Sequence, residues 1–416
     1  MARLAVNGGE PVRTEPWPDW PVYGKAEEEA LLGVLRSGRW YHAERVREFE
    51  QAFAAFQGAR FAVTTCNGTA ALEAALVCCG VKAGDEVIIP SYTFQATADA
   101  VLRANAVPVF CDVELDTFNL DVDAAAALVT DRTRAIVPVH WVGLPCDMDR
   151  IGKLAEEHDL VVVEDACHSW GSQWKGKGTG ALGDAGGFSF QLSKNMTAGE
   201  GGIVLTDDEE LAALMRSFTN CGRGLDDPWY YHYRTGSNYR MTEFQAALLL
   251  AQLGRMDEHT HLRRENARRL SAELSQIPGI HTIREDERVT RRAYHGYQMR
   301  FVSDEFDGVS RGRFMAALSA EGVPCYGGYK EPLYGHWLFK HSGDGPEYCP
   351  LSCPYYGVKR DYLDVDCPNA ERICREAVWL RHSMLLAAPA DMDDIAAALR
   401  KVYENRAELA EGEGEG

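Results

Sequence analysis

The feature that most constrains the fold is a regular alternation of short apolar segments and helical segments between residues 60 and 207. Most of the apolar segments are continuous runs rather than alternating patterns, which is typical of strands buried on both faces. Their sequences are RFAVTTC, EVIIP, VPVFCDV, RAIVPVHW, LVVVEDAC, GGFSFQ and GGIVLTD. Because helices separate them, we predict an α/β fold built on a mostly parallel, seven-stranded sheet covered on two sides.

The length of 416 residues exceeds what one compact core usually holds, so we expect more than one domain. We predict an arm and a large domain over residues 1–260 and a smaller α+β domain over 261–405. A helical segment over 241–274 is expected to link them. The acidic, Gly-rich residues 406–416 are expected to be disordered.

Composition excludes several classes of protein. The net charge of −19 disfavours binding to nucleic acid or anionic membranes.

We expect no signal peptide and no transmembrane helix, and therefore a cytoplasmic protein. The 12 cysteines are expected to be reduced thiols. The late cysteines do not have the paired C-x2-C spacing of common zinc sites, so we expect no metal; they are Cys349, Cys353, Cys367 and Cys374.

Ligands of open α/β sheets bind beyond the carboxyl ends of the strands. After the first strand, Asn67 is a good N-cap for a helix that starts with Gly68 and Thr69. Such a helix start can bind phosphate, although this motif alone favours ordinary capping, which needs no ligand. Neither G-x-G-x-x-G nor GK[ST] follows this strand, which counts against NAD-dependent oxidoreductases and ATP enzymes.

Two later strands end in charged residues. Asp165 follows the buried run VVVE, where a carboxylate needs a partner. That partner could be a protonated pyridine nitrogen, neighbouring backbone or Mg²⁺. His168 alone is more often a satisfied polar group than a catalyst. Lys194 follows GGFSF and precedes the turn AGEGG, and a lysine in such a site can form an imine with an aldehyde.

Taken together, five stretches make the chain resemble the fold-type-I pyridoxal-phosphate (PLP) aminotransferases of the DegT/StrS type, which aminate keto-sugars and ketocyclitols. The resemblance extends from about residue 5 to about residue 405. The stretches are CNGTAALEAAL, GDEVIIPSYTFQATADAV, VVVEDACHSWGS, GDAGGFSFQLSKNMTAGEGGIVLTD and GSNYRMTEFQAALLLAQL.

The resemblance implies that Lys194 holds PLP as a Schiff base and that Asp165 pairs with the pyridine nitrogen. It also implies a homodimer that completes each site. The further positions that it implies are Gly68 and Thr69 in the phosphate turn, Ser189 on the phosphate, Phe94 stacked on the ring, His168 near the phenolic oxygen, and Asn238 reaching the neighbouring subunit's phosphate.

The resemblance also implies the reaction. One branch of the family has histidine in place of the lysine and removes a hydroxyl group, so Lys194 favours transamination. The stretch after residue 366, CPNAERICREAVWLRHSMLL, is similar to the aminocyclitol branch, which takes its amine from L-glutamine. This implies transfer to a ketocyclitol or keto-sugar in antibiotic biosynthesis. Alternatives are dehydration or decarboxylation on the same scaffold, or a non-catalytic PLP-binding regulator.

Overall fold

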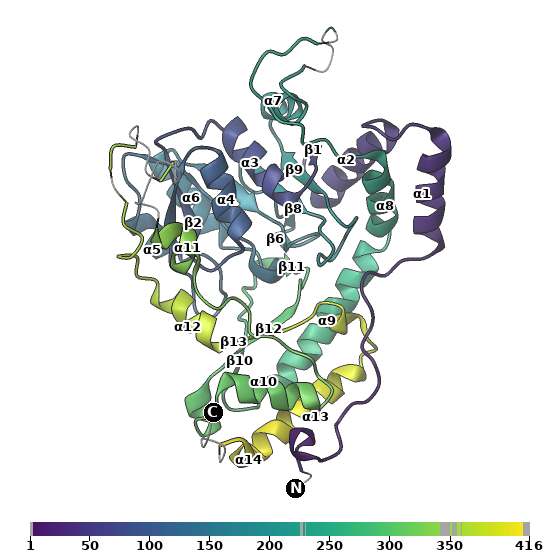
Figure 1. The fold of residues 1–416 in the computed structure, drawn as a ribbon, viewed down its shortest axis with the longest axis vertical. Helices are drawn as coiled ribbons and strands as arrows, with labels where there is room; N and C mark the ends of the chain where they lie inside the picture. Colours follow the sequence, from purple (N-terminus) through teal and green to yellow (C-terminus); the bar gives the residue numbers. More distant parts are fainter. Residues whose placement is uncertain are drawn as a thin grey trace.

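The protein is described here from a computed structural model, which covers residues 3–224, 228, 230–341, 350–351, 356–358 and 360–410. Its centre is a seven-stranded sheet (Figure 1). In spatial order the strands are β1 (Phe61–Thr65), β9 (Gly202–Thr206), β8 (Ala185–Ser189), β5 (Val161–Asp165), β4 (Thr133–Ile136), β2 (Glu86–Pro90) and β3 (Val107–Cys111). Only β9 runs antiparallel to its neighbours in this sheet, which confirms the predicted mostly parallel α/β fold.

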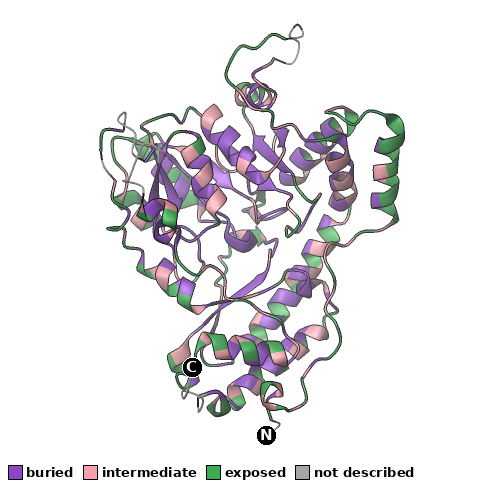
Figure 2. Cartoon of the chain, in the orientation of Figure 1, coloured by how far each residue is buried: buried purple, intermediate pink, exposed green. Residues whose placement is uncertain are grey.

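The strands of this sheet are buried on both faces, as their continuous apolar sequences predict. In β2, Val87 and Ile89 belong to one core cluster, whereas Ile88 between them belongs to another. This alternation follows from the period of two in a strand. The helices between the strands are α3 (Gly68–Cys78), α4 (Gln95–Arg103), α5 (Val122–Ala127), α6 (Met148–His158) and α7 (Glu209–Thr219). Figure 2 shows the large sheet as the most deeply buried layer.

Three further helices pack together beside the sheet (Figure 1). They are α1 (Lys25–Ser37), α2 (Glu44–Gln57) and α8 (Glu243–Leu253), and α8 packs against the other two. The single helical segment predicted over 241–274 is wrong in one respect. It breaks at Gly254, and α9 (Met256–Leu274) begins as a separate helix. Figure 1 shows α9 running from the large sheet toward a second, smaller part of the molecule.

The second part is α+β, as predicted. Its antiparallel sheet has the order β10 (Ile280–Thr282), β12 (Tyr297–Phe301) and β13 (Ala377–Leu380). Its helices include α10 (Arg311–Ala320), α13 (Asp391–Glu404) and α14 (Ala407–Ala410). In contrast, α11 (Trp337–Lys340) packs on the large sheet, where the Phe339 ring lies 4.8 Å from that of Phe110 in β3. The helix α12 (Pro368–Glu376) contacts β12 and also shares the core of the large sheet. A third small sheet joins β11 (Val289–Arg291) to β6 (Gln173–Trp174) and β7 (Lys177–Gly178). The domain boundary near residue 260 stays a prediction.

Both ends of the described chain pack into this second part. Leu4 is fully buried in the same cluster as Val402 and Leu409. The structure differs here from the expected disorder of residues 406–416, because the apolar Leu409 anchors α14 to that core. Residues 411–416 lie outside the described residues.

Two expected absences concern metals and membranes. Cys367 and Cys374 are buried free thiols, and Cys349 and Cys353 lie outside the described residues. Within the described ranges, no cluster of His, Cys, Asp and Glu could hold a metal ion. The helices that the structure describes include none long and apolar enough to cross a bilayer.

Candidate active site at the carboxyl ends of the strands

Asp165 is the last residue of β5, and its side chain is held by two hydrogen bonds. Thr97 Oγ1 donates to Asp165 Oδ2 at 2.7 Å, and the backbone N–H of Cys167 donates to Oδ1 at 3.1 Å. The Thr93 hydroxyl lies 3.0 Å from that of Thr97 and donates to it, because the Thr97 proton is already engaged. Asp165 is 5% exposed, so these donors stabilise a carboxylate that little water reaches.

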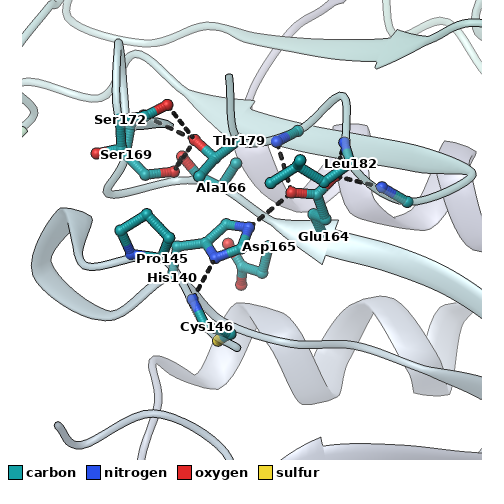
Figure 3. Close-up of polar contacts among 12 residues, drawn as sticks. His140, Pro145, Cys146, Glu164, Asp165, Ala166, Ser169, Ser172, Thr179 and Leu182 are labelled. Atoms are coloured by element: carbon teal, nitrogen blue, oxygen red, sulfur yellow. Dashed lines mark hydrogen bonds and ion pairs between the residues drawn. The ribbon is translucent and has the colours of Figure 1, made fainter. Parts of the chain in front are cut away.

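The residue before it, Glu164, anchors the loops behind the site. Its fully buried carboxylate accepts a hydrogen bond from His140 Nε2 at 2.7 Å (Figure 3). It also accepts the backbone N–H groups of Gly180, Leu182 and Gly183. His140 Nδ1 accepts from the Cys146 N–H, so the ring proton must be on Nε2. Glu164 therefore ties the end of β5, which carries Asp165, to the loop at His140 and to the loop at residues 180–183.

Lys194 follows β8 by five residues, and its amine lies in the same neighbourhood as Asp165. Burial lowers the pKa of the Lys194 amine, and the nearby Cys167 thiol and Asp165 carboxylate oppose that shift. A lowered pKa increases the fraction of neutral amine, which is the form that attacks a carbonyl.

The start of α3 lies against the end of β8. The Asn67 side chain caps α3 by accepting the N–H of Ala70 at 2.8 Å, and the first N–H groups of a helix lack acceptors within it. A Cβ atom added to Gly68 would lie only 2.7 Å from Ser189 Cβ, so this approach requires glycine. Gly68, Thr69 and Ser189, predicted separately from sequence, thus form one polar cradle suited to a phosphate.

Phe94 occupies the N-cap position of α4, one turn before Thr97. Its side chain is 59% exposed, although most large apolar residues nearby are buried. Phe94 is therefore not part of the packed core of this chain. An exposed aromatic ring close in sequence to Thr97, which binds Asp165, can cover the face of a planar ligand.

His168 lies in a column of imidazoles. Its ring stacks on His295 with centroids 4.5 Å apart, and His295 stacks in turn on His382 at 5.5 Å. Burial, and then the charge of Lys194, hold the pKa of His168 well below its usual range. Its Nδ1 atom is buried and has no hydrogen-bond partner among the described residues. A neutral imidazole with an unused nitrogen is therefore available to a bound ligand.

The column stands between the two parts of the molecule. Trp141, which follows β4, packs edge-on against His168 with centroids 5.3 Å apart and contacts Trp379 of β13 at 5.5 Å. Sequence reasoning missed His295, His382 and Thr97. Only Thr97 carried a local signal, because it lies in the PSYTFQAT stretch that also contains Phe94.

Asn238 is the one predicted site residue that lies apart from this group. It is exposed and pairs as an isolated bridge with Asn220, just after α7. The segment that contains it extends beyond α7 at the top of Figure 1. Three tyrosines of the same segment are strongly exposed, namely Tyr230, Tyr231 and Tyr233.

The seven-stranded sheet, with a lysine, an aspartate and a phosphate cradle at its carboxyl edge, defines a fold-type-I PLP enzyme. The chain belongs to the DegT/DnrJ/EryC1/StrS aminotransferase family, whose sequence profile matches residues 21–400. The resemblance seen in the sequence is thereby confirmed, and the protein is a PLP-dependent aminotransferase.

Three relatives illustrate the family. The chain is 40% identical over 431 residues to the L-glutamine:2-deoxy-scyllo-inosose aminotransferase of Streptomyces fradiae, covering 99% of this chain and 100% of that one. The crystal structure of 3-amino-5-hydroxybenzoic acid synthase superimposes with a TM-score of 0.84 at 36% identity, over 94% and 100% of the two chains. DesI, solved in the presence of its TDP-sugar product, gives 0.81 at 32% identity, over 98% of each chain.

Proposed function

We propose that the protein transfers the amino group of L-glutamine to a cyclic ketone of the ketocyclitol class, with PLP held by Lys194. The observation that carries the proposal is the convergence of Lys194, Asp165 and the phosphate cradle at one edge of the sheet. The name of the Streptomyces fradiae relative supports this choice of donor and acceptor.

The side chains fit PLP group by group. The cradle of Gly68, Thr69 and Ser189 suits a phosphate monoester. The exposed Phe94 ring can cover the pyridine, and the unused Nδ1 of His168 is free to meet a polar substituent of that ring.

When bound, the cofactor supplies an aldehyde that condenses with amines and a ring that takes up electrons. Asp165, whose carboxylate accepts hydrogen bonds from Thr97 and the Cys167 N–H, would pair with the ring nitrogen and keep a proton on it. Lys194 would hold the cofactor, and its free amine would take the proton from the donor Cα. Its lowered pKa favours the neutral amine that this proton transfer needs.

We propose that the working form is a homodimer and that Asn238 binds the phosphate in the neighbouring site. The exposure of Asn238 supports this role, because an exposed side chain is accessible to a second subunit. We also propose that the enzyme is cytoplasmic.

The test is an absorbance spectrum of the purified protein before and after addition of L-glutamine. We expect a visible band that glutamine converts to a shorter-wavelength band, with one equivalent of the keto acid 2-oxoglutaramate released. Lys194→Ala should remove the visible band, whereas Lys177→Ala, which breaks an exposed ion pair with Asp207, should leave it unchanged.

The outcomes also separate the alternatives. A protein that shows no such band after incubation with PLP would overturn the proposal. A band that persists with glutamine, without release of keto acid, would favour dehydration, decarboxylation or a regulator. After the first half-reaction, recovery of the visible band with 2-deoxy-scyllo-inosose would support a cyclitol acceptor. Recovery only with a TDP-linked keto-sugar would overturn the cyclitol proposal and identify a nucleotide-linked sugar as the acceptor.

A further inference from the structure

We propose that Trp20 and His382 are positioning residues for Lys194, because they hold the two peptide carbonyls that immediately precede it. The inference rests on the role proposed for Lys194 and names residues for which the sequence offered no function. We call this arrangement the carbonyl clasp, and it consists of Trp20, His382 and the carbonyls of Leu192 and Ser193.

The clasp is made of two short hydrogen bonds to consecutive residues. Trp20 Nε1 donates to the Leu192 carbonyl at 2.8 Å, and His382 Nε2 lies 3.0 Å from the Ser193 carbonyl. The side chains of Leu192 and Ser193 are both exposed, so apolar burial does not hold this turn. Its internal bonds are local, from the Lys194 N–H to the Gln191 carbonyl and from the Ser193 N–H to Gln191 Oε1.

A buried arginine fixes the proton of His382 on the nitrogen that the clasp requires. Arg263 of α9 is fully buried, and its Nη2 lies 3.2 Å from His382 Nδ1. A guanidinium only donates, so Nδ1 must accept and the ring proton must be on Nε2. Nε2 can then donate to the Ser193 carbonyl.

The other contacts of Arg263 also involve residues of the clasp, because its Nε donates to the His382 carbonyl at 3.4 Å and its guanidinium lies 5.7 Å from the centre of the Trp20 ring. Among the described residues Arg263 forms no ion pair, and its Nη1 atom is buried without a hydrogen-bond partner. Burying a cation without a carboxylate is costly, and burial lowers the pKa of Arg263. The position of Arg263 beside His382 is consistent with a requirement for the His382 tautomer that has its proton on Nε2.

The clasp also joins the imidazole column of the site. Trp20 packs edge-on against His382 with centroids 4.5 Å apart, and His382 stacks on His295. The donors come from the N-terminal arm and from the segment after β13, while the acceptors follow β8. Three distant parts of the chain therefore converge on the peptide next to Lys194.

The chemistry gives a reason for such a device. The Lys194 amine must leave a carbon atom and later return to it, so its side chain has to move. If the backbone moved as well, the amine would lose the alignment that makes its return fast. Holding the carbonyls on the N-terminal side of Lys194 leaves the side chain free while its point of attachment stays fixed.

The first readout is hydrogen exchange of the Ser193 and Lys194 amides in the purified full-length protein. Trp20→Phe and His382→Phe keep the aromatic rings and remove the N–H donors. We expect each to speed exchange of these two amides about tenfold, the effect of losing one hydrogen bond. The matched control is Trp17→Phe, because Trp17 Nε1 donates to the Gly322 carbonyl at 2.8 Å from the same arm.

The second readout is the rate at which L-glutamine consumes the visible band. In both variants the limiting rate should fall about tenfold, while the half-saturating glutamine concentration stays within about twofold. His382→Gln, which restores an N–H donor, should recover most of the rate and of the protection from exchange.

Unchanged exchange in both variants would overturn the clasp, as would an equal effect of Trp17→Phe or an uncorrected defect in His382→Gln. Faster exchange with an unchanged limiting rate would also overturn it, since the contacts would then have no bearing on Lys194. If the wild type binds no PLP, the proposed function fails by itself, whereas the exchange readout still decides whether these contacts hold the turn.

Discussion

Thr97 Oγ1 lies 2.7 Å from Asp165 Oδ2, although 68 residues separate the two in sequence. Thr97 is in the first turn of α4, which follows β2, and Asp165 ends β5, so this contact joins the carboxyl ends of two strands. Through it, the segment that carries Phe94 is tied to the carboxylate that is proposed to pair with the cofactor.

Thr97→Val should slow the first half-reaction by about 10- to 100-fold, because Asp165 loses a hydrogen bond to a charged group worth ~1.5–3 kcal/mol. The rate at which L-glutamine converts the visible band measures this first half-reaction. Thr130→Val is the matched control, since Thr130 Oγ1 donates to buried Glu86 at 2.6 Å, far along the chain from these residues. Equal rates in wild type and Thr97→Val would show that this bond does not support Asp165.

Gly68→Ala should weaken cofactor binding, because the added methyl group would lie 2.7 Å from Ser189 Cβ and force the cradle apart. We expect the dissociation constant of PLP to rise at least about tenfold, in line with the loss of one or two well-placed hydrogen bonds. Fluorescence titration with PLP measures it.

The control for that change is Gly152→Ala in α6, where an added Cβ meets nothing within 4 Å. It should leave PLP affinity unchanged and raise the free energy of unfolding by about 0.5–1 kcal/mol, through the better helix propensity of alanine. Wild-type affinity in Gly68→Ala would contradict the phosphate cradle.

Stability should fall in mild acid because of the imidazole column. Burial holds the pKa values of His168, His295 and His382 well below their ordinary range, so acid protonates the unfolded chain first. The stabilisation is complete above the ordinary histidine pKa and is lost as the pH falls below it. His382 alone should account for about 1.4 kcal/mol one pH unit below that value.

Urea denaturation between pH 7.5 and 5.5 measures this loss. His382→Phe should show a shallower decline than wild type, whereas His158→Phe, which replaces an exposed histidine at the end of α6, should keep the wild-type slope. Parallel pH profiles for all three proteins would contradict a neutral, buried His382.

Mixing two inactive variants tests the proposed dimer. Lys194→Ala lacks the amine, and Asn238→Asp should repel the phosphate in the neighbouring site. In a mixed dimer, one of the two sites receives intact Lys194 and intact Asn238, so random reassociation should restore about a quarter of the wild-type activity. If Asn238 acted within its own chain, the mixture would contain no intact site and would stay inactive.

Much of the fold could be predicted because it depends on local patterns. Continuous apolar runs give buried strands, and β2 was predicted to the residue. The site residues at strand ends followed from topology, since the carboxyl ends of parallel strands meet at one edge. The break at Gly254 was missed because the apolar periodicity continues from α8 into α9 and the glycine alone is a weak stop signal.

The contacts that support the site could not be predicted in the same way. Thr97, His295, His382 and Arg263 reach the site through tertiary packing between segments far apart in sequence, and no periodicity encodes such pairings. His382 lies in RHSMLL, a stretch noted only for its resemblance to one branch of the family. Its role depends on Arg263, which is more than a hundred residues earlier in the chain.

The packing of Leu4 beside Val402 and Leu409 has a consequence for synthesis on the ribosome. Leu4 belongs to a core whose members near Val402 and Leu409 are translated much later. The arm, and with it Trp20, therefore cannot take its final place until Val402 and Leu409 have been synthesised. The hydrogen bond from Trp20 to the Leu192 carbonyl can form only at that stage. The large sheet would therefore form before the turn that precedes Lys194 is held in position.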